Sequence, residues 1–371
     1  MSQHCEPARS TPNLGPVLVT GGNGFIASHI IDKILEGDPS CEIHSLDINT
    51  SRNCHPNAHY HQGDISCLAD VQRIMRTAKP VTVFHTAAPE FFDLPESAYQ
   101  SIIVDGTNNL INAAVDIETV HCLVYTSTSS LIHDNLTDLF DAMEDMPVLR
   151  PPQQKRVYSL RKADAEEVVL TANRNKGFLT CSLRPCFTIG ERCIDGLGRM
   201  VASAQGGWAR YRLGNGKNLY DFVYVGNVAD AHVLAAQHLV NAWGKAPTSN
   251  PDSRVDGEVF HITNGSPWLF WDFQREVAAQ TGNPVRQEEI IVVPKWLVVT
   301  IGFLTEYIVW AVSLGSRSPT MTRDGIRFGT ITRTISGDKA MRVLGYQPRV
   351  SVQEGIERGV KWILEHQKIV R

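Results

Sequence analysis

The amino-acid sequence predicts an α/β protein built on a doubly wound parallel sheet. Strand and helix patterns alternate through the first half of the chain, a glycine-rich turn joins the first strand to the first helix, and polar residues follow several strands. Such alternation buries both faces of a parallel sheet under helices, and ligands bind beyond the carboxyl ends of its strands. Strands are expected at 16–20, 41–47, 58–62, 81–85, 121–127 and 179–184, and helices at 24–36, 66–78, 97–115 and 157–175.

The first predicted strand breaks into a glycine-rich turn that indicates a dinucleotide site. Glycine allows a tight turn and lets the backbone approach a ligand closely. The helix that follows directs free N–H groups and its positive dipole end at the same place, which favours a pyrophosphate. Ala27 occupies the third glycine position of the Rossmann-type fingerprint, as that fingerprint permits, although such turns also merely connect strands to helices. The residues expected to contact the dinucleotide here are Gly21, Gly24, Phe25 and Ile26.

The second predicted strand ends in a carboxylate that bears on the choice of cofactor. Asp47 lies where an acid binds the adenosine ribose hydroxyls of NAD. Ile48 and Asn49 follow it, and neither offers a charge to the 2′-phosphate of NADP. NAD is therefore the expected cofactor. Arg52 is close enough in the sequence to keep NADP as the alternative.

Later strand ends supply further candidate contacts with the dinucleotide. Asp64 follows the third strand, where it can reach the adenine amino group, and its alternative role is a helix N-cap ahead of Ser66. Thr86 and Ala87 follow the fourth strand, and such small residues would let a nucleotide lie against the backbone. The expected set is completed by two apolar residues at strand ends, Ile65 and Pro185.

A tyrosine and a lysine at the start of the 157–175 helix are the candidate catalytic pair. Tyr158 and Lys162 are four residues apart and therefore share one helical face. A free tyrosine has a pKa near ~10, but an ammonium one turn away and a cationic nicotinamide would lower the pKa of Tyr158. A lowering by about 3 corresponds to roughly 4 kcal/mol and would make Tyr158 a general base near neutral pH. Lys162 can also bind the nicotinamide ribose. A tyrosine and a lysine four residues apart also occur by chance in many chains.

These stretches resemble the extended short-chain dehydrogenases/reductases over about residues 15–365. A hydroxyl cluster at 126–130, one strand and one loop before Tyr158, belongs to the same resemblance, as does Pro185. The narrower resemblance is to the 3β-hydroxysteroid dehydrogenase branch, most of all to its fungal-type sterol-4α-carboxylate 3-dehydrogenases. The stretches that carry it are 221–232, 294–296 with the apolar segment and Glu306 after them, 344–348 and 354–356.

The resemblance implies NAD-dependent oxidation of the 3β-hydroxyl of a sterol or triterpenoid. It assigns the alcohol proton to Tyr158 and the alcohol oxygen to Thr128 or Ser127. A substrate with a C4 carboxylate would yield a β-keto acid that loses CO2. Two alternatives stay open: a dehydrogenase of another terpenoid or specialised metabolite without decarboxylation, and a non-catalytic dinucleotide sensor. The Tyr158 and Lys162 pair favours an enzyme, because a sensor has no need of it.

Two residues depart from the pattern of that family. Thr128 stands where the family usually has a second serine, so Ser127 or Ser129 could hold the substrate oxygen instead. Ile103 stands where an asparagine is sometimes assigned to a proton-relay water. Either the relay runs differently here or the chain has diverged toward its own substrate.

Length and composition suggest a globular chain with two regions. The predicted division is a disordered tail at 1–14, an NAD-binding domain at 15–190 completed by about 218–264, and a substrate-binding region at 191–217 and 265–371. A formal charge of −4 spread over the 371 residues gives no basic surface for nucleic acid. The polar start lacks the apolar core of a signal peptide. None of the eight cysteines forms a C-x-x-C pair, so reduced thiols and no metal site are expected.

The most apolar stretch, at 291–314, bears on contact with membranes. It is interrupted by Glu306, and an acid at mid-bilayer costs roughly 2.5–3.5 kcal/mol. Three interpretations stay open for the helix at 296–314: a buried or substrate-covering helix, a helix that dips into one membrane face, and, last, a true span. We expect peripheral contact with the cytosolic side of the endoplasmic reticulum. The oligomeric state stays open, and a homodimer is compatible with the sequence.

Overall fold

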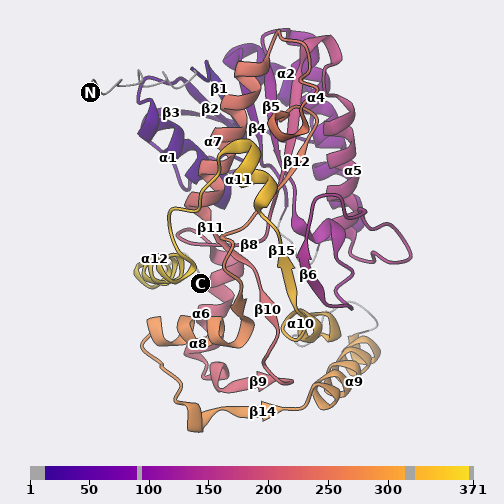
Figure 1. The fold of residues 1–371 in the computed structure, drawn as a ribbon, viewed down its shortest axis with the longest axis vertical. Helices are drawn as coiled ribbons and strands as arrows, with labels where there is room; N and C mark the ends of the chain where they lie inside the picture. The colour runs from indigo at the N-terminus through magenta and orange to yellow at the C-terminus, as the bar shows by residue number, and fades with distance from the viewer. Residues whose placement is uncertain (1–12, 90–93, 314–321, 367–371) are drawn as a thin grey trace, which may run out of the picture.

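The larger sheet of the protein is parallel and has the strand order β12-β7-β5-β4-β1-β2-β3 (Figure 1). The computed structural model describes residues 13–89, 94–313 and 322–366. The neighbouring strands β1 and β4 begin the two halves of the sheet, so the crevice for a ligand lies beyond their carboxyl ends. Its strands are β1 (Val17–Thr20), β2 (Ile43–Asp47), β3 (Ala58–Gln62), β4 (Thr82–His85), β5 (Cys122–Thr126), β7 (Leu179–Pro185) and β12 (Val259–Ile262).

Helices cover both faces of this sheet, as the alternating pattern predicts. One apolar core packs α1 and α7 against the strands, and a second core packs α2, α4 and α5 on the opposite face. The covering helices are α1 (Phe25–Gly37), α2 (Leu68–Ala78), α4 (Gly106–Ile117), α5 (Val157–Thr171) and α7 (Val225–Ala242). All six predicted strands and all four predicted helices are present. The expected helix at 97–115 is divided into α3 (Glu96–Tyr99), a π-helical segment (Gln100–Asp105) and α4.

A smaller region lies below the larger sheet in Figure 1. Its four-stranded sheet has the order β13-β10-β15-β6, and two further pairs join β11 to β8 and β14 to β9. Its strands are β6 (Leu139–Ala142), β8 (Phe187–Ile189), β9 (Tyr211–Leu213), β10 (Leu219–Tyr220), β11 (Phe222–Tyr224), β13 (Trp268–Leu269), β14 (Ile291–Val293) and β15 (Arg333–Ile335). The remaining helices are α6 (Arg199–Gln205), α8 (Phe270–Gln280), α9 (Lys295–Ser313), α10 (Arg323–Phe328), α11 (Asp338–Leu344) and α12 (Val352–Glu365).

An aromatic core holds the smaller region together. The rings of Phe222 and Phe273 stack with their centres 3.7 Å apart, and Tyr220 and Phe270 pack beside them. The last part of the chain does not belong to this region alone. Helix α11 packs against the core of the larger sheet, although the expected substrate-binding region included it. The division into domains therefore stays a prediction.

The first described residues are anchored to the larger sheet. Leu14 is buried, and its carbonyl oxygen accepts a hydrogen bond of 2.7 Å from the Thr82 hydroxyl. The predicted disordered tail at 1–14 is wrong for this residue, because an apolar side chain and a backbone bond hold it in place. The rest of that tail, at 1–12, lies outside the described residues.

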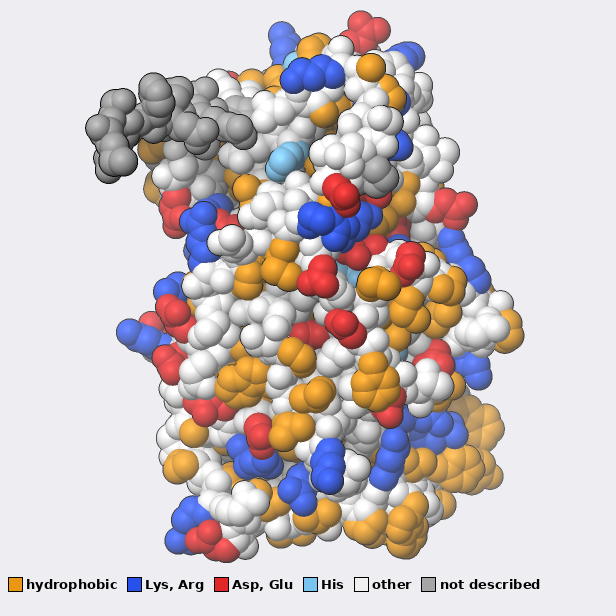
Figure 2. All heavy atoms as spheres, in the orientation of Figure 1, with side chains coloured by type: hydrophobic (Ala, Val, Ile, Leu, Met, Phe, Trp, Pro, Cys, Tyr) orange, Lys and Arg blue, Asp and Glu red, His pale blue; other side chains and the backbone are white. Residues whose placement is uncertain are grey.

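Helix α9 lies at the edge of the smaller region, and most of its side chains are exposed. Only Val298 and Gly302 are buried. Of the interpretation as a buried or substrate-covering helix, the buried part is wrong, because one narrow face of α9 packs on α10 and most of its other side chains are exposed. The substrate-covering part stays a prediction, and Glu306 of α9 lines the cavity described below. Figure 2 shows the resulting apolar surface at the lower right of the molecule. Among the described residues, α9 is the one helix long and apolar enough to cross a membrane.

Candidate active site

The glycine turn between β1 and α1 forms a cradle at the carboxyl edge of the larger sheet. Gly21 has a φ of +68°, and a Cβ atom there would lie 2.8 Å from the Cα atom of Ala87 on the neighbouring strand end. Gly24 is the N-cap of α1, and no side chain among the described residues caps the first amides of that helix. Backbone close to the turn and amides without a side-chain cap suit the pyrophosphate of a dinucleotide.

The Asp47 carboxylate is fixed beside this turn. It accepts hydrogen bonds from the amides of Asn23, at 3.0 Å, and Asn49, at 2.9 Å. The Asn23 side chain also donates to the Arg52 carbonyl oxygen at 2.5 Å, so the backbone of Arg52 is held next to the same corner. Ile48 points into solvent. Asp47, the residue that favours NAD, and the backbone of Arg52, the residue that keeps NADP as the alternative, therefore both lie against Asn23 of the turn.

Other predicted contact residues also lie at this edge. The Thr86 hydroxyl donates to the Thr20 carbonyl oxygen at 2.6 Å, which ties the end of β4 to β1 beside Ala87. Ile65 is buried, and Asp64 is exposed. The Asp64 carboxylate accepts from the amide and hydroxyl of Ser66. It is not the N-cap of α2, because Cys67 holds that position, so the alternative role for Asp64 is wrong.

The catalytic candidates Tyr158 and Lys162 occupy the first two turns of α5. The Lys162 ammonium is buried and donates to the Thr126 carbonyl oxygen at 2.6 Å and to the Tyr125 hydroxyl at 3.1 Å. Burial lowers the pKa of Lys162 to about 7, and Glu166 opposes that shift. Burial, followed by the nearby Tyr99 hydroxyl, raises the pKa of the Tyr158 phenol.

The sequence predicts that Lys162 and a cationic nicotinamide together lower the pKa of Tyr158. In the chain alone, burial raises this pKa, and the lysine lies against the oxygens of β5, so the joint effect of the two charges stays a prediction. A lowered pKa of the Tyr158 phenol therefore depends on the other charge, the cationic nicotinamide ring at the cofactor site.

The hydroxyl cluster after β5 brings Thr128 into the same cavity as Tyr158. The Thr128 hydroxyl accepts from the Ser130 amide at 3.2 Å and donates to the Ser130 hydroxyl at 3.1 Å, and Ser130 is bonded to Ser159 of α5 at 2.9 Å. Ser127 is buried, does not line the cavity, and its hydroxyl has no hydrogen-bond partner among the described residues. These positions favour Thr128 over Ser127 as the group that meets a ligand.

The cavity lies between the two regions and has a volume of about 790 Å³, within the range of small-molecule sites. Pro185, the last residue of β7, lines it together with Thr128 and Tyr158. Its apolar wall comes mostly from the smaller region, and includes Phe187, Met200, Tyr220 and Phe328. A bulky apolar ligand with one polar end fits such a lining.

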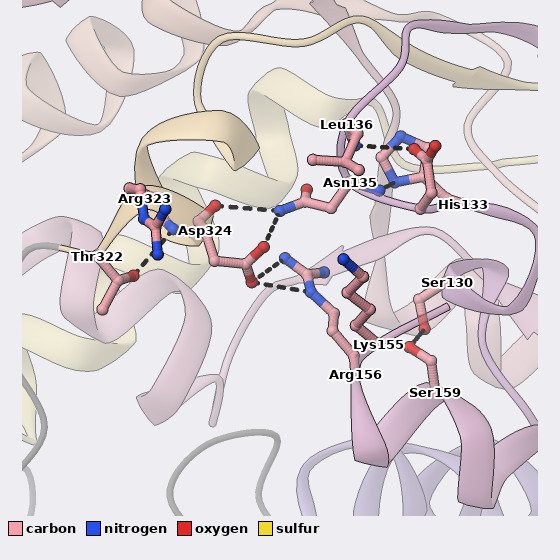
Figure 3. A network of polar contacts seen from close by, with 12 residues as sticks. Ser130, His133, Asn135, Leu136, Lys155, Arg156, Ser159, Thr322, Arg323 and Asp324 are labelled. Atoms are coloured by element: carbon pink, nitrogen blue, oxygen red, sulfur yellow. Dashed lines mark hydrogen bonds and ion pairs between the residues drawn. The ribbon is translucent and has the colours of Figure 1, made fainter. Parts of the chain in front are cut away.

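One side of this cavity is closed by an ion pair between the regions, shown in Figure 3. The Arg156 guanidinium, at the start of α5, points at the Asp324 carboxylate of α10 with bonds of 2.9 and 2.6 Å. Asn135 also bonds to Asp324, at 2.5 Å. On α9, Glu306 accepts from the amide of Arg323 at 2.6 Å and from its guanidinium at 2.7 Å. Helices α9 and α10 are thereby fixed over the cavity.

A comparison with known protein families identifies the family of the chain. The model of the 3-beta hydroxysteroid dehydrogenase/isomerase family matches residues 18–294. The chain belongs to this family. The resemblance that the sequence motifs indicate is therefore confirmed at the level of the family.

Within the 3-beta hydroxysteroid dehydrogenase/isomerase family, the chain is similar to sterol enzymes over nearly its whole length. The sterol-4-alpha-carboxylate 3-dehydrogenase, decarboxylating, of Saccharomyces cerevisiae is 34% identical over 94% of this chain and 98% of that protein. The Candida albicans protein of the same name is 32% identical over 95% and 99%. The Arabidopsis thaliana 3beta-hydroxysteroid-dehydrogenase/decarboxylase isoform 2 is 31% identical over 92% of this chain and 61% of that protein.

Solved structures share the fold of this family member. The UDP-glucose 4-epimerase of Thermotoga maritima, solved with UDP-glucose, has a TM-score of 0.68 and 22% identity over 95% of this chain and 99% of that one. The dTDP-glucose 4,6-dehydratase DesIV of Streptomyces venezuelae, a double mutant solved with NAD, has a TM-score of 0.69 and 23% identity over 96% and 99%. At these identities the likeness supports the fold alone, a Rossmann-type sheet with a C-terminal region.

Several residues of the site are not evident from the sequence of this family member. Tyr125 interrupts the apolar run of β5 and is the buried hydroxyl that meets Lys162. Arg156 and Asp324 are 168 residues apart, and no local pattern connects them. Ile103, the departure at the proton-relay position, is buried in the core beside α4.

Proposed function

We propose that this chain uses NAD to oxidise the 3β-hydroxyl of a sterol that carries a 4α-carboxylate, and that the 3-keto product then loses CO2. The observation that most supports this proposal is the cavity at the carboxyl edge of the larger sheet. Tyr158 and Thr128 line this cavity together with mostly apolar side chains. The sterol dehydrogenases to which the chain is similar over almost its full length support the same substrate class.

The reaction assigns one role to each group. The Tyr158 phenolate takes the alcohol proton while the Thr128 hydroxyl holds the alcohol oxygen. Bound NAD would supply the hydride acceptor and a positive ring that favours the phenolate, and Lys162 would hold its nicotinamide ribose. In the 3-keto acid, the new ketone accepts the electrons of the breaking carbon–carbon bond, which leaves an enol and releases CO2.

An assay of the purified protein tests this function. Reduction of NAD should be seen with a 4α-carboxy-3β-hydroxysterol, together with release of CO2 and a ketone of matching mass. Reduction with other terpenoid alcohols but with no 4-carboxysterol would favour the alternative without decarboxylation. No reduction with any alcohol, despite binding of NAD, would favour a sensor.

The choice of cofactor gives the first testable prediction. NAD should be preferred over NADP by at least about tenfold in kcat/KM, or about 1.4 kcal/mol, because Asp47 binds the ribose hydroxyls and repels a 2′-phosphate. Steady-state kinetics with both dinucleotides check it. Equal kinetics would contradict it, and Arg52→Ala would then show whether the side chain of Arg52, whose backbone is held at this corner, is responsible.

The hydroxyl cluster gives a second prediction. Thr128→Val keeps the shape of the side chain but removes the proposed oxygen ligand, so turnover should fall by about 10² or more, as for loss of an oxyanion donor. Ser129→Ala should cost less, and Thr128→Ser is the matched control that keeps the hydroxyl. The reverse order of Thr128→Val and Ser129→Ala would show that another hydroxyl of the cluster holds the oxygen.

Helix α9 supports peripheral attachment to the cytosolic face of the endoplasmic reticulum. The side chains of Trp296, Phe303, Tyr307 and Trp310 on it are half or more exposed, and Ile291 and Val292 of β14 extend the apolar surface. Glu306, the one acid of α9, is paired with Arg323 and so does not interrupt the apolar surface formed by these described residues. Aromatic and aliphatic groups with Lys295 at the helix start suit an interfacial anchor.

Fractionation of cells tests this attachment. Most of the protein should sediment with membranes and be released by alkaline carbonate. Trp310→Glu should move the protein to the soluble fraction, because it places a charge in the apolar surface. Met341→Glu, an exposed apolar residue on α11 outside that surface, is the matched control and should not. Retention after carbonate would indicate a span instead, and wild-type protein in the soluble fraction would argue against attachment.

A further inference from the structure

A two-stranded ribbon beside helix α9 carries basic side chains that the proposed reaction does not use. Its strands β9 and β14 are parallel, with Arg212 opposite Val292, and the Gly214 amide donates to the Val293 carbonyl oxygen at 2.9 Å. Strand β14 leads directly into α9, which begins at Lys295. The ribbon and α9 therefore lie together along the lower end of the molecule in Figure 1.

The two segments that form the ribbon are basic, although the chain as a whole is acidic. Residues 208–219 and 286–297 contain five basic and two acidic side chains, whereas the 371 residues together carry a formal charge of −4. The five basic residues are Arg210, Arg212, Lys217, Arg286 and Lys295. Cations gathered at one end of an acidic molecule repel one another and attract a partner of opposite charge.

Four of these five cations form no ion pair with a carboxylate in the described part of the chain. Arg286 is the exception, because it pairs with Glu288 and Glu289. Arg212 is half-buried, and the other three side chains are exposed. We call these three exposed residues the basic cluster: Arg210, Lys217 and Lys295. Their charges are available to a partner, since no ion pair among the described residues has to be broken first.

Exposed apolar side chains border the basic cluster. Three of the four exposed tryptophans of the described chain lie in the ribbon segments or on α9, and Ile291 and Val292 of the ribbon are 47% and 49% exposed. These tryptophans are Trp208, Trp296 and Trp310. Figure 2 shows basic and apolar side chains together across this lower end. Tryptophan favours the boundary between lipid tails and headgroups, and basic side chains extend from there to the headgroups.

This combination distinguishes a charged membrane from other partners. Nucleic acid would pair with the cations but would leave the exposed apolar groups of the ribbon and α9 in water. A neutral membrane would cover those apolar groups but would offer no charge to the basic cluster. A bilayer that contains anionic phospholipids satisfies both, because its surface carries a negative potential above an apolar interior.

We propose that the basic cluster binds the headgroups of anionic phospholipids, so that the protein selects negatively charged membrane surfaces over neutral ones. This inference rests on the proposed attachment through α9. The apolar side chains of α9 enter the bilayer, while Lys295 at its start and the ribbon beside it meet the phosphate groups. Attraction of this kind acts over about 10 Å at ~0.1 M salt, so the cluster needs no shaped pocket.

Flotation of the purified protein with lipid vesicles tests this selection. Vesicles of phosphatidylcholine alone are compared with vesicles in which about 30% of the lipid is phosphatidylserine, at ~0.1 M salt. Partition onto the anionic vesicles should be about 100-fold stronger, since each cation near such a surface contributes about fivefold. At about 1 M salt the difference should fall below about tenfold, because the Debye length shortens to about 3 Å. Equal partition onto both kinds of vesicle at ~0.1 M salt would overturn the proposal.

A triple variant removes the basic cluster. In Arg210→Gln/Lys217→Gln/Lys295→Gln, partition onto anionic vesicles should fall about 100-fold. Partition onto neutral vesicles should stay within about threefold of wild type, because no lipid charge is lost there. An unchanged preference for anionic vesicles in this variant would overturn the proposal.

A second triple variant provides the matched control. Arg76→Gln/Lys79→Gln/Lys176→Gln also removes three exposed cations, from the ends of α2 and α5. These helices end at the amino edge of the larger sheet, whereas the smaller region lies beyond its carboxyl edge (Figure 1). Because salt screens charges that are far from the lipid, partition should stay within about threefold of wild type. Equal losses in both triple variants would assign the preference to net charge and overturn the proposal.

Separate outcomes distinguish the selection of lipid from the attachment on which it rests. Trp310→Glu, which places a charge in the apolar surface, should weaken partition onto both kinds of vesicle. Wild-type protein that binds both kinds equally keeps the attachment and loses the selection, whereas binding to neither kind defeats both. These wild-type measurements keep the proposal testable if the first triple variant fails to fold, which its melting temperature would show.

Discussion

Tyr158→Phe should cut turnover by about 10² to 10⁴, the usual contribution of a general base, while the affinity for NAD stays nearly unchanged. The substitution removes one oxygen and keeps the ring that packs against Tyr99, with centres 6.1 Å apart. Because the helix and the cavity wall keep their shape, the loss should appear in kcat. Pre-steady-state hydride transfer and direct titration with NAD separate the two effects.

The neighbouring tyrosine supplies a control for this experiment. Tyr99→Phe removes a hydroxyl of the same kind from the partner ring, yet it should lower turnover by less than about tenfold, a small share of the contribution of a general base. Since the Tyr99 hydroxyl raises the pKa of Tyr158, its removal should also move the acidic limb of the pH–rate profile, where the rate rises as the base loses its proton, to lower pH. Retention of half the wild-type turnover by Tyr158→Phe would contradict the assigned base.

The parallel sheet and the cofactor edge could be predicted because their signals are local. A buried strand such as Val17–Thr20 is a short apolar run, and its carboxyl end is marked by glycine within a few residues. Once the alternation fixes a parallel sheet, all carboxyl ends fall at one edge, so Asp47 and Thr86 are expected on the same side. The resemblance added roles for these residues that the patterns alone do not give.

The direction of the Lys162 side chain could not be predicted from spacing. Four residues along a helix place two side chains on one face, but they do not say where a long side chain ends. The Thr126 carbonyl oxygen and the Tyr125 hydroxyl accept the ammonium, and both belong to a strand 36 or more residues earlier. Spacing alone therefore does not show how much of the predicted lowering of the pKa of Tyr158 comes from Lys162 and how much from the cationic nicotinamide.

Sequence patterns could not predict the substrate side of the cavity, because segments that are far apart in the chain form it. Arg333 meets Ser129 across 204 residues, and β15 is a three-residue strand with no distinctive periodicity. The apolar composition of α9 was evident, but composition cannot say which neighbour covers a helix. In the structure only Val298 and Gly302 of α9 are buried, so the helix is not a core helix.

The largest loss of stability should follow from breaking the buried ion pair between Glu166 of helix α5 and Arg184 of strand β7. Glu166 of α5 accepts from the Arg184 guanidinium, with Nε distances of 3.1 and 3.0 Å, and from the Ser182 hydroxyl at 2.7 Å. Both charged side chains are buried, with 3% and 4% of their surfaces exposed. The pair ties α5 to β7 one helical turn after Lys162.

Glu166→Met should lower the free energy of unfolding by about 3–5 kcal/mol, because it leaves the Arg184 charge buried without a partner. That is a large share of the 5–15 kcal/mol typical of a native protein, about a fifth or more. Thermal unfolding of wild type, Glu166→Met and the double variant Glu166→Met/Arg184→Met checks it. The double variant should recover most of the stability, since replacing both charges with apolar groups of similar volume is often neutral. A double variant no more stable than Glu166→Met would show that the contacts of Glu166 with Ser182 and with its helix, rather than the unpaired charge, carry the loss.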